Sequence, residues 1–363
     1  MNGPDIIASI ASDIERQLQH HEPQALAPIP ATISPWLAAA LLQKAIRRGR
    51  THFALGAAAT LLSKAPDRLW RRLAVIAVED VGLGDLDAVF LTIVAAGQRR
   101  RLARLYGMER LVSFIVSRLT ISRKCRATDD LYVVTNDCPS WNGDRLELTD
   151  MPLNDLLDVI AGPDPIERRG IAVRHAMGGG EWAEDIRLTR RRRPQAVFDF
   201  LCEAGFPQTL VEICREAHRQ TGEAICGFLP LLWSVFDRSE TVVRSDEFPS
   251  EVTIAGVPSW ALDKFTRQGR TAMARFLARD SGTSRWLDSH VAKRDRGAVF
   301  GHALFRAESG LVKDRAVWPD GLSLRRQADW NSFAALEPVE AVELLHLVRA
   351  DIGLLNEERA HVL

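Results

Sequence analysis

The chain has 363 residues and a formal net charge of zero at pH 7, because 47 Lys and Arg residues balance 47 Asp and Glu residues. Hydrophobic residues make up 46% of the sequence and charged residues 26%, the composition of an ordinary globular protein. This length predicts about two domains. The zero net charge excludes recognition of an acidic or basic partner through the charge of the whole protein, so any such surface must come from how the charges are distributed.

The cysteines predict neither a zinc site nor a disulfide framework. They are odd in number and lack C-x-x-C spacing: Cys125, Cys138, Cys202, Cys214 and Cys226. No apolar run reaches the ~18 residues that a membrane span needs, and Asp5 stands where a signal peptide would be basic. We therefore expect a reduced cytoplasmic protein with no metal, no other cofactor and no membrane contact.

Residues 1–34 divide into an amphipathic helix and a proline-rich linker. Apolar residues at three- and four-residue spacing form one stripe of the helix: Ile7, Ile10, Ile14 and Leu18. Prolines from Pro23 to Pro35 then prevent a continuous helix. We expect the helix to pack against the rest of the chain, with a partner protein as the alternative.

Five further helices are predicted before residue 126. Ser34 and Pro35 form an N-cap followed by proline at the first helical position, which begins a helix over 35–48. An alanine-rich helix follows over 51–63, and apolar residues at helical spacing predict the next over 70–81. Asp85 is placed to cap a fourth helix, and the fifth covers 109–119.

The helix over 70–81 ends in an acidic pair and a glycine turn. Glu79 follows Arg72 by seven residues, so both lie on one polar stripe. We predict that Glu79 is structural and forms an ion pair with Arg72 or with an arginine of a neighbouring helix. Asp80 points about 100° away from Glu79, while Gly82 ends the helix and Asp85 begins the next.

Two motifs in this region, in order and at a suitable separation, resemble a known family. The first is Leu-Leu-Gln-Lys-Ala-Ile-Arg-Arg-Gly at 41–49, and the second runs from Arg71 through Glu79 and Asp80 to Leu83. Together they resemble the C-terminal helical region of the RarA/MgsA family. These are AAA+ ATPases related to clamp loaders and associated with stalled replication forks. The resemblance covers residues 35–98.

The ATPase module of that family has no counterpart in the sequence. No G-x-x-x-x-G-K-[ST] phosphate loop occurs, and the Gly178–Glu181 segment lacks the lysine and hydroxyl that hold phosphate and Mg²⁺. Leu86 also replaces the proline that the family has after Asp85. We therefore expect no ATP hydrolysis. The resemblance implies a helical module that assembles with copies of itself, as a tetramer in the family, or with a replication or AAA+ protein.

The basic residues are unevenly distributed. Residues 41–126 hold 17 Lys and Arg against six Asp and Glu, an excess of 11 in a neutral protein. Such clusters bind nucleic-acid phosphates without reading sequence, although arginines at helix ends also complement the helix dipole. The candidate DNA contacts are Lys44, Arg47, Arg48, Arg99, Arg100 and Arg101, together with Arg190 and Arg191 from the basic run at 187–193.

Beyond residue 126 the pattern stays mainly helical. We predict a short strand at 131–135 and a small hairpin from 241–243 and 252–254. Helices are expected over 153–160, 165–177, 196–204, 208–219 and 222–237. Another is expected from Ser259, where Asp263, Arg267 and Arg270 would form a surface ladder. A loop-like basic–aromatic patch follows Pro319. Apolar residues over 339–355 repeat in 4-3 steps, as in a packing or oligomer seam.

We therefore predict a mainly all-α fold, a two-lobed multi-helix bundle with minor β-hairpin elements. Its expected divisions are 1–34, a RarA/MgsA-like helical domain at 35–180 and a second helical domain at 181–363. The favoured function is a non-enzymatic, oligomerising, DNA-associated module in replication, recombination or DNA maintenance. No catalytic motif is recognisable, so no catalytic residue is assigned. The alternatives are a protein-interaction adaptor without DNA binding, and a metal-dependent hydrolase or nuclease using Glu79, Asp80 and a distant histidine.

Overall fold

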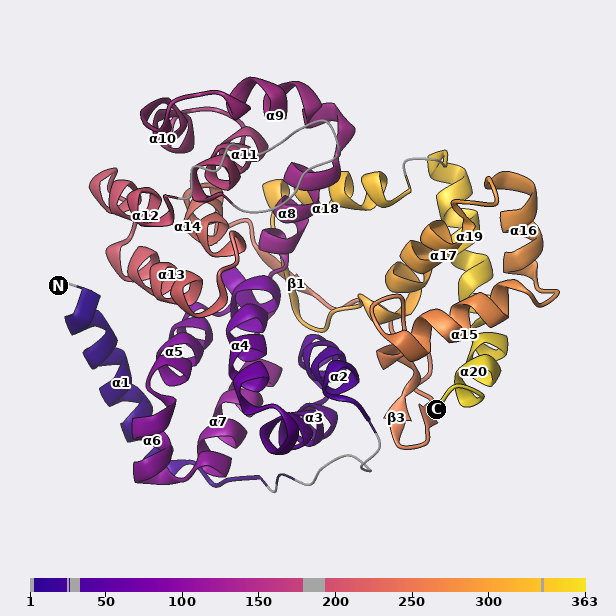
Figure 1. Cartoon of the computed structure of the whole chain (residues 1–363), viewed down its shortest axis with the longest axis horizontal. Helices are drawn as coiled ribbons and strands as arrows, with labels where there is room; N and C mark the ends of the chain where they lie inside the picture. The colour runs from indigo at the N-terminus through magenta and orange to yellow at the C-terminus, as the bar shows by residue number, and fades with distance from the viewer. Residues whose placement is uncertain (1–2, 25, 27–32, 179–192, 334–335) are drawn as a thin grey trace. The chain divides into compact units, whose positions relative to one another are not determined.

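The computed structural model describes residues 3–24, 26, 33–178, 193–333 and 336–363 (Figure 1). Helices account for most of these residues, and the described strands form two small two-stranded sheets. The prediction of a mainly all-α fold is confirmed. Among the helices of the described residues, none combines the length and apolar character that a membrane span requires.

Contacts divide the chain into two compact units that interleave along the sequence. Unit 1 comprises Met1–Gln24, Trp70–Arg244 and Asp314–Asn331, and unit 2 comprises Ala25–Leu69, Ser245–Lys313 and Ser332–Leu363. Each unit gathers three separate segments, so this division does not follow the expected boundaries at 34 and 180. A packed core needs side chains that meet in space, whether or not they are neighbours in sequence.

Unit 1 is built from helices on both sides of the glycine turn at residues 82–84. Its α-helices are α1 (Gly3–His20), α4 (Pro66–Ile76), α5 (Leu86–Gly97), α6 (Arg99–Tyr106), α7 (Met108–Ile121), α8 (Ala127–Asp137), α9 (Asn142–Thr149), α10 (Leu153–Ala161), α11 (Ile166–Met177), α12 (Pro194–Glu203), α13 (Gln208–Thr221), α14 (Ile225–Val235) and α18 (Pro319–Ser332). The shorter elements are the π-helix η1 (Ala77–Val81), the 3₁₀-helices η2 (Gly82–Gly84) and η3 (Pro139–Trp141), and the antiparallel strands β1 (Val242–Arg244) and β4 (Arg315–Val317).

Helix α5 occupies the centre of the N-terminal half of unit 1. Its sequence is apolar on nearly every face, and residues from Ala88 to Ala96 are buried apart from Phe90. A helix of this kind must be surrounded by protein, and α1, α7, α13 and η1 all contact it (Figure 1). The packing of α1 confirms that the N-terminal helix docks on its own chain. Ile14 and Leu18 of the predicted stripe are buried, but Ile7 and Ile10 are half-buried and Ile6 is buried in their place.

Unit 2 has a helical hairpin and a separate C-terminal core. The hairpin is α2 (Pro35–Arg47) with α3 (Thr51–Lys64), and Ser34 caps α2 by accepting from the Leu37 amide, as predicted. The remaining α-helices are α15 (Arg267–Leu277), α16 (Gly282–His290), α17 (Arg296–Leu304), α19 (Pro338–Ala350) and α20 (Ile352–Ala360). They are joined by the 3₁₀-helix η4 (Ser259–Ala261), the π-helix η5 (Phe305–Ser309) and the hairpin of β2 (Thr253–Ile254) with β3 (Val257–Pro258).

The closing apolar repeat packs inside unit 2. Val348 and Leu355 of this repeat lie in the cluster formed with α15, α16 and α17, and Ala341 and Leu345 pack against it partly buried. The chain breaks between α19 and α20 instead of continuing as one helix. The 4-3 spacing over 339–355 is therefore an internal packing seam in this unit.

The prediction of a strand at 131–135 was wrong, and the prediction of a hairpin was wrong in its strand pairing. Residues 131–135 belong to helix α8, because Ala127, Leu131 and Val134 form a buried stripe at helical spacing that overrides their β propensity. Both segments expected in the hairpin do contain strands, but β1 pairs with β4 and β2 pairs with β3. Strand partners are chosen by tertiary packing, which a local pattern does not reveal.

Two predictions about the second half also fail. The region after Pro319 is helix α18, with proline at its first position and a buried stripe of Gly321, Leu324 and Ala328. The ladder of Asp263, Arg267 and Arg270 does not form, because α15 begins only at Arg267 and Asp263 is fully buried before it.

Candidate nucleic-acid interface

The segment predicted as one helix over 70–81 changes its helical type along its length. Helix α4 gives way to the π-helix η1 at Ala77, and η2 follows at Gly82. Gly82 has φ +46°, and a Cβ on it would lie 2.8 Å from the Cys125 carbonyl oxygen. A Cβ on Gly84 would lie 2.6 Å from the Arg123 carbonyl oxygen. Only glycine permits this backbone to cross so close to residues 123–125.

The turn is fastened to the segment that follows α7. The Cys125 amide donates to the carbonyls of Asp80 and Val81, both at 3.0 Å. After the turn, Asp85 caps α5 by accepting from the Ala88 amide, and it also binds Arg118 at 3.1 Å. The predicted roles of Gly82 and Asp85 are confirmed.

Arg126 is the centre of an acidic cluster at the same place. It forms ion pairs with Asp80 and Asp129, and its Nη1 lies 3.6 Å from the Glu79 carboxylate. Burial acts to lower the pKa of Arg126, but Asp129, Asp80 and Glu79 outweigh it and raise that pKa. Glu79 thus has an arginine from the start of a neighbouring helix, one of the two partners expected.

This cluster contains Glu79 and Asp80, the two carboxylates named for the metal-dependent alternative. Glu79 and Asp80 face a buried guanidinium, which takes the place that a cation would need. In the part of the chain that the structure describes, no group of three or more His, Cys, Asp or Glu side chains is arranged to hold a metal ion.

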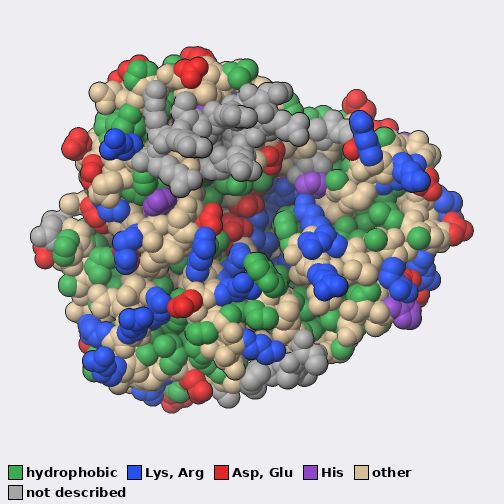
Figure 2. Space-filling model, viewed as in Figure 1, with side chains coloured by type: hydrophobic (Ala, Val, Ile, Leu, Met, Phe, Trp, Pro, Cys, Tyr) green, Lys and Arg blue, Asp and Glu red, His purple; other side chains and the backbone are tan. Residues whose placement is uncertain are grey.

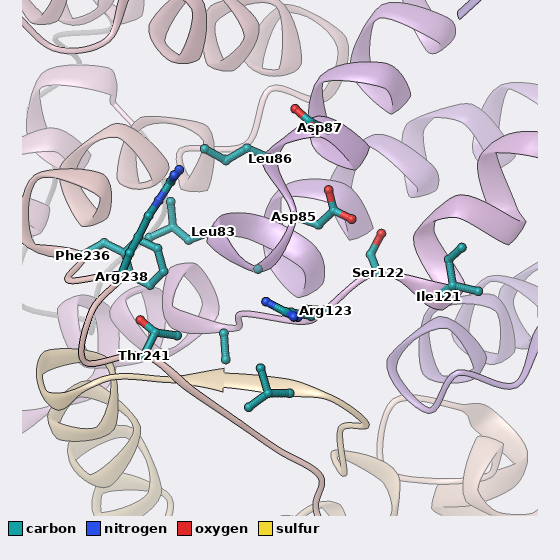
Figure 3. A pocket seen from close by; sticks show the side chains of 13 residues that line it. Leu83, Asp85, Leu86, Asp87, Ile121, Ser122, Arg123, Phe236, Arg238 and Thr241 are labelled. Carbon is teal, nitrogen blue, oxygen red and sulfur yellow. The ribbon is translucent and has the colours of Figure 1, made fainter. Parts of the chain in front are cut away.

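A pocket of about 660 Å³ opens beside the glycine turn. Cross-strand partners Val243 and Ala316 form part of its lining. In Figure 3, Leu83, Leu86, Phe236 and Arg238 lie on one side of the view, and Asp85, Ser122 and Ile121 on the other. The lining combines exposed Arg123 and Arg238 with Asp85 and Asp87, and the 69% exposed Ile121 adds an apolar surface.

The first three candidate DNA contacts are internal to unit 2. Lys44, Arg47 and Arg48 are only 3%, 5% and 5% exposed. The Lys44 Nζ lies 2.7 Å from the Asp263 carboxylate, and Arg48 Nη2 donates to the Glu308 carbonyl at 2.5 Å. These side chains are therefore part of a buried polar core and do not present a surface to phosphate.

Burial shifts the pKa values of the charged groups in this core. It lowers the pKa of Lys44, although Asp263 acts in the opposite direction, and it lowers the pKa of Arg48 to about 10. Burial alone would raise the pKa of Glu308, but Arg359 and Arg48 outweigh it and hold that pKa below its usual value.

The second group of candidates does lie at the surface. Arg99 is half-buried, while Arg100 and Arg101 are exposed on α6 together with Arg104. Figure 2 shows Lys and Arg side chains gathered at the lower left of the view, where Figure 1 places α6. Arg190 and Arg191 lie outside the described residues.

Comparisons with family models, curated proteins and solved structures gave no match. The resemblance of residues 35–98 to the RarA/MgsA region therefore stays a prediction carried by its two motifs.

Sequence reasoning missed the partner that matters most, Arg126. Its spacing of three residues before Asp129 marks a helix start with an acidic first turn, which is a usable signal. Nothing local indicates that Arg126 also meets Asp80, because that contact depends on how α8 packs against η1.

Proposed function

We propose that this chain is a non-enzymatic, DNA-associated module that binds the phosphate backbone without reading sequence and assembles with copies of itself. The observation that carries the proposal is helix α6, on which Arg100 and Arg104 lie four residues apart and are both exposed. Residues at this spacing share one helix face. Among the described residues, no carboxylate lies within ion-pair distance of either.

The surroundings of α6 favour an anionic partner. Its eight residues, Arg99–Tyr106, contain four arginines and no acidic residue. Arg101 alone of Arg100, Arg101 and Arg104 is paired, with Glu15, and its side chain is still 49% exposed. Neutralising phosphates with such arginines releases counterions, so the affinity depends on salt and not on base sequence. A replication or AAA+ protein is a further partner that the resemblance suggests.

The test is binding of labelled forked, single-stranded and duplex DNA by fluorescence anisotropy over a range of salt. Arg100→Glu combined with Arg104→Glu should weaken binding to every sequence alike. It should also flatten the log–log salt dependence by about 0.9 for each duplex phosphate that is no longer neutralised. Arg219→Glu is the matched control, because Arg219 is 69% exposed but already paired with Glu216. Absence of DNA binding by the unmodified chain near physiological salt would refute the proposal.

A protein-interaction adaptor is the second candidate, and the pocket beside the glycine turn favours it. Ile121 and Val243 are exposed at this pocket, and Arg123 and Arg238 offer charged contacts around them. An adaptor of this kind would bind no DNA. It would bind a partner protein in a way that Ile121→Asp abolishes and the α6 variant does not.

A further inference from the structure

Unit 2 carries a second basic surface, and all of its residues lie outside the basic segment 41–126. It lies where the chain enters α15 and where α17 passes into η5, and we call it the Phe265 patch. Its members are Lys264, Phe265, Arg267, Arg270, His302 and Arg306. Figure 2 shows Lys and Arg side chains over the part of the view where Figure 1 places the start of α15.

An aromatic ring stands at the centre of this patch. Phe265 is 61% exposed, and Phe305 holds it by an edge-to-face contact with centroids 5.7 Å apart. Within 253–329, where the structure describes every residue, Phe265 is the one large hydrophobic side chain with such exposure. Isolated exposed apolar residues are common. Exposure of Phe265 therefore indicates a binding site only in combination with the residues around it.

Those neighbours are cations. The Lys264 Nζ lies 5.1 Å from the Phe265 ring centroid and 5.7 Å from that of Phe305, and the Arg306 guanidinium lies 5.7 Å from the Phe305 centroid. Arg267 and Arg270 are exposed on the first turn of α15. In the described part of the chain, no carboxylate lies within ion-pair distance of either arginine.

The sequence of these elements explains the absence of compensating charge. Residues 264–279 contain five Lys and Arg and no Asp or Glu, and residues 296–306 contain two arginines and no acid. Arg275, Arg279 and Arg296 pair with carboxylates of other segments, which leaves Lys264, Arg267, Arg270 and Arg306 around the ring. The nearest acid along the chain, Asp263, is buried against Lys44. Positive charge therefore accumulates around Phe265.

The pKa of His302 is affected by the positive charge of this patch. Its Nδ1 lies 2.9 Å from the Lys264 Nζ and must accept, because an ammonium only donates. Burial, Lys264 and Arg306 together lower the pKa of His302 to about 4, so the ring is neutral at physiological pH. The neutral ring leaves its Nε2–H as a donor.

We propose that the Phe265 patch binds single-stranded nucleic acid, with an unpaired base stacked on Phe265 and the flanking phosphates held by Arg267 and Arg270. Aromatic rings and cations in one groove or patch are the usual elements of single-strand binding, since every base has a face that stacks. A duplex keeps its bases stacked internally and offers Phe265 only phosphates. The inference rests on the proposed function for its class of ligand, but it uses none of the α6 arginines.

The test measures the full chain against a labelled oligothymidylate of about 20 nucleotides, the matching oligouridylate and a duplex of the same length. Phe265→Ala should weaken single-strand binding by about 5- to 100-fold, the cost of losing one stacked base, and should change duplex binding by less than about twofold. Phe265→Trp should retain or improve single-strand binding. Arg267→Ala with Arg270→Ala should reduce the single-strand salt slope by about 0.7 for each phosphate that these arginines neutralise. Lys293→Ala, an exposed residue of the same unit, should have no effect.

Each other outcome has a definite meaning. If a folded Phe265→Ala variant binds the single strand as the unmodified chain does, the inference is refuted, while weaker binding by the α6 variant would still support the proposed function. If the unmodified chain binds none of the nucleic acids, both proposals fail. If it binds vesicles containing anionic phosphatidylserine in a Phe265-dependent way and binds no oligonucleotide, the patch is a membrane contact and the inference is overturned. A preference for the oligouridylate over the oligothymidylate would support the site and identify RNA as its ligand.

Discussion

Asp80 and Arg126 form a buried ion pair that joins the π-helical end of η1 to the start of α8. Unit 2 contains the same arrangement: Glu308 in the π-helix η5 binds Arg359 at 2.6 Å, and both side chains are almost fully buried. π-Helical turns are rare and often mark functional positions. Here each of the two turns aims a carboxylate into the interior of its own unit, where an arginine neutralises it.

The pair predicts a ranking of two adjacent carboxylates. Asp80→Asn should destabilise the protein by about 1–3 kcal/mol, because it removes the fully buried charge opposite Arg126 while Asp129 still pairs with that guanidinium. Glu79→Gln should cost about 1 kcal/mol or less, since Glu79 is 17% exposed and its contact is longer. Urea unfolding of both variants would measure this. Equal losses of stability in the two variants would contradict the ranking. If the Glu79→Gln protein unfolds like the unmodified chain but no longer binds DNA, Glu79 has a functional role.

The glycine turn predicts a strong dependence on side-chain size. Gly82→Ala should cost about 1–3 kcal/mol from backbone strain alone, because φ is +46° there. The contact of the new Cβ with the Cys125 carbonyl should add to that cost. Gly143→Ala is the matched control, since a Cβ there meets nothing within 4 Å in helix α9, and it should be neutral or slightly stabilising. Thermal melts that show equal effects for the two variants would refute this account.

The buried position of Arg48 predicts a loss of stability and not of DNA binding alone. Its guanidinium lies 4.8 Å from the Phe248 ring and 4.9 Å from the Trp260 ring, besides bonding to Glu308. Arg48→Ala should cost about 2–5 kcal/mol, because it leaves a cavity between the two rings and removes the hydrogen bond to the buried Glu308 carbonyl. Arg50→Ala should cost at most about 1 kcal/mol, because Arg50 is half exposed in its pair with Glu251. Selective loss of DNA binding in a fully stable Arg48→Ala protein would contradict the structure.

Stability should fall as the pH drops from about 6.5 towards 4. The pKa of His302 is about 4 in the folded protein and 6.5 in its ordinary state, so the unfolded chain binds the proton first over this range. The stability that His302 contributes is therefore complete above pH 6.5 and is lost progressively below it, and His175, whose pKa burial also lowers to about 4, adds to the same loss. His302→Gln should flatten the dependence of melting temperature on pH, and His346→Gln, at an exposed position of α19, should not. A pH profile that His302→Gln leaves unchanged would refute this assignment.

The mass of the particle in solution tests whether the chain assembles with copies of itself. Light scattering at micromolar concentration should give more than one 40.4 kDa unit, as the RarA/MgsA resemblance implies. The apolar faces of 70–81 and 339–355 are packed within their own units, so the contact must use other surfaces. Val339 and Val342, 78% and 54% exposed on α19, form such a surface, and Val339→Lys with Val342→Lys should lower the mass. A monomer in the unmodified chain would contradict the prediction and weaken the resemblance.

Local sequence determined most of the helices and several of their ends. The caps at Ser34 and Asp85 and the apolar stripe of α1 depend on residues three or four apart, whose contacts form within a single turn. The local sequence also predicts the glycine turn after Asp80, because a helix cannot continue through the backbone angles that Gly82 adopts.

Tertiary structure alone decided which charges are buried. Lys44, Arg47 and Arg48 look like a solvent-facing helix end in sequence. Yet Asp263 beside Lys44, Phe305 beside Arg47 and Glu308 beside Arg48 come from distant segments that only folding brings together. The same holds for α8, where burial of Leu131 and Val134 decided between helix and strand. A periodic pattern specifies the face of an element, but the low dielectric of a core and its ion pairs arise only where separate elements meet.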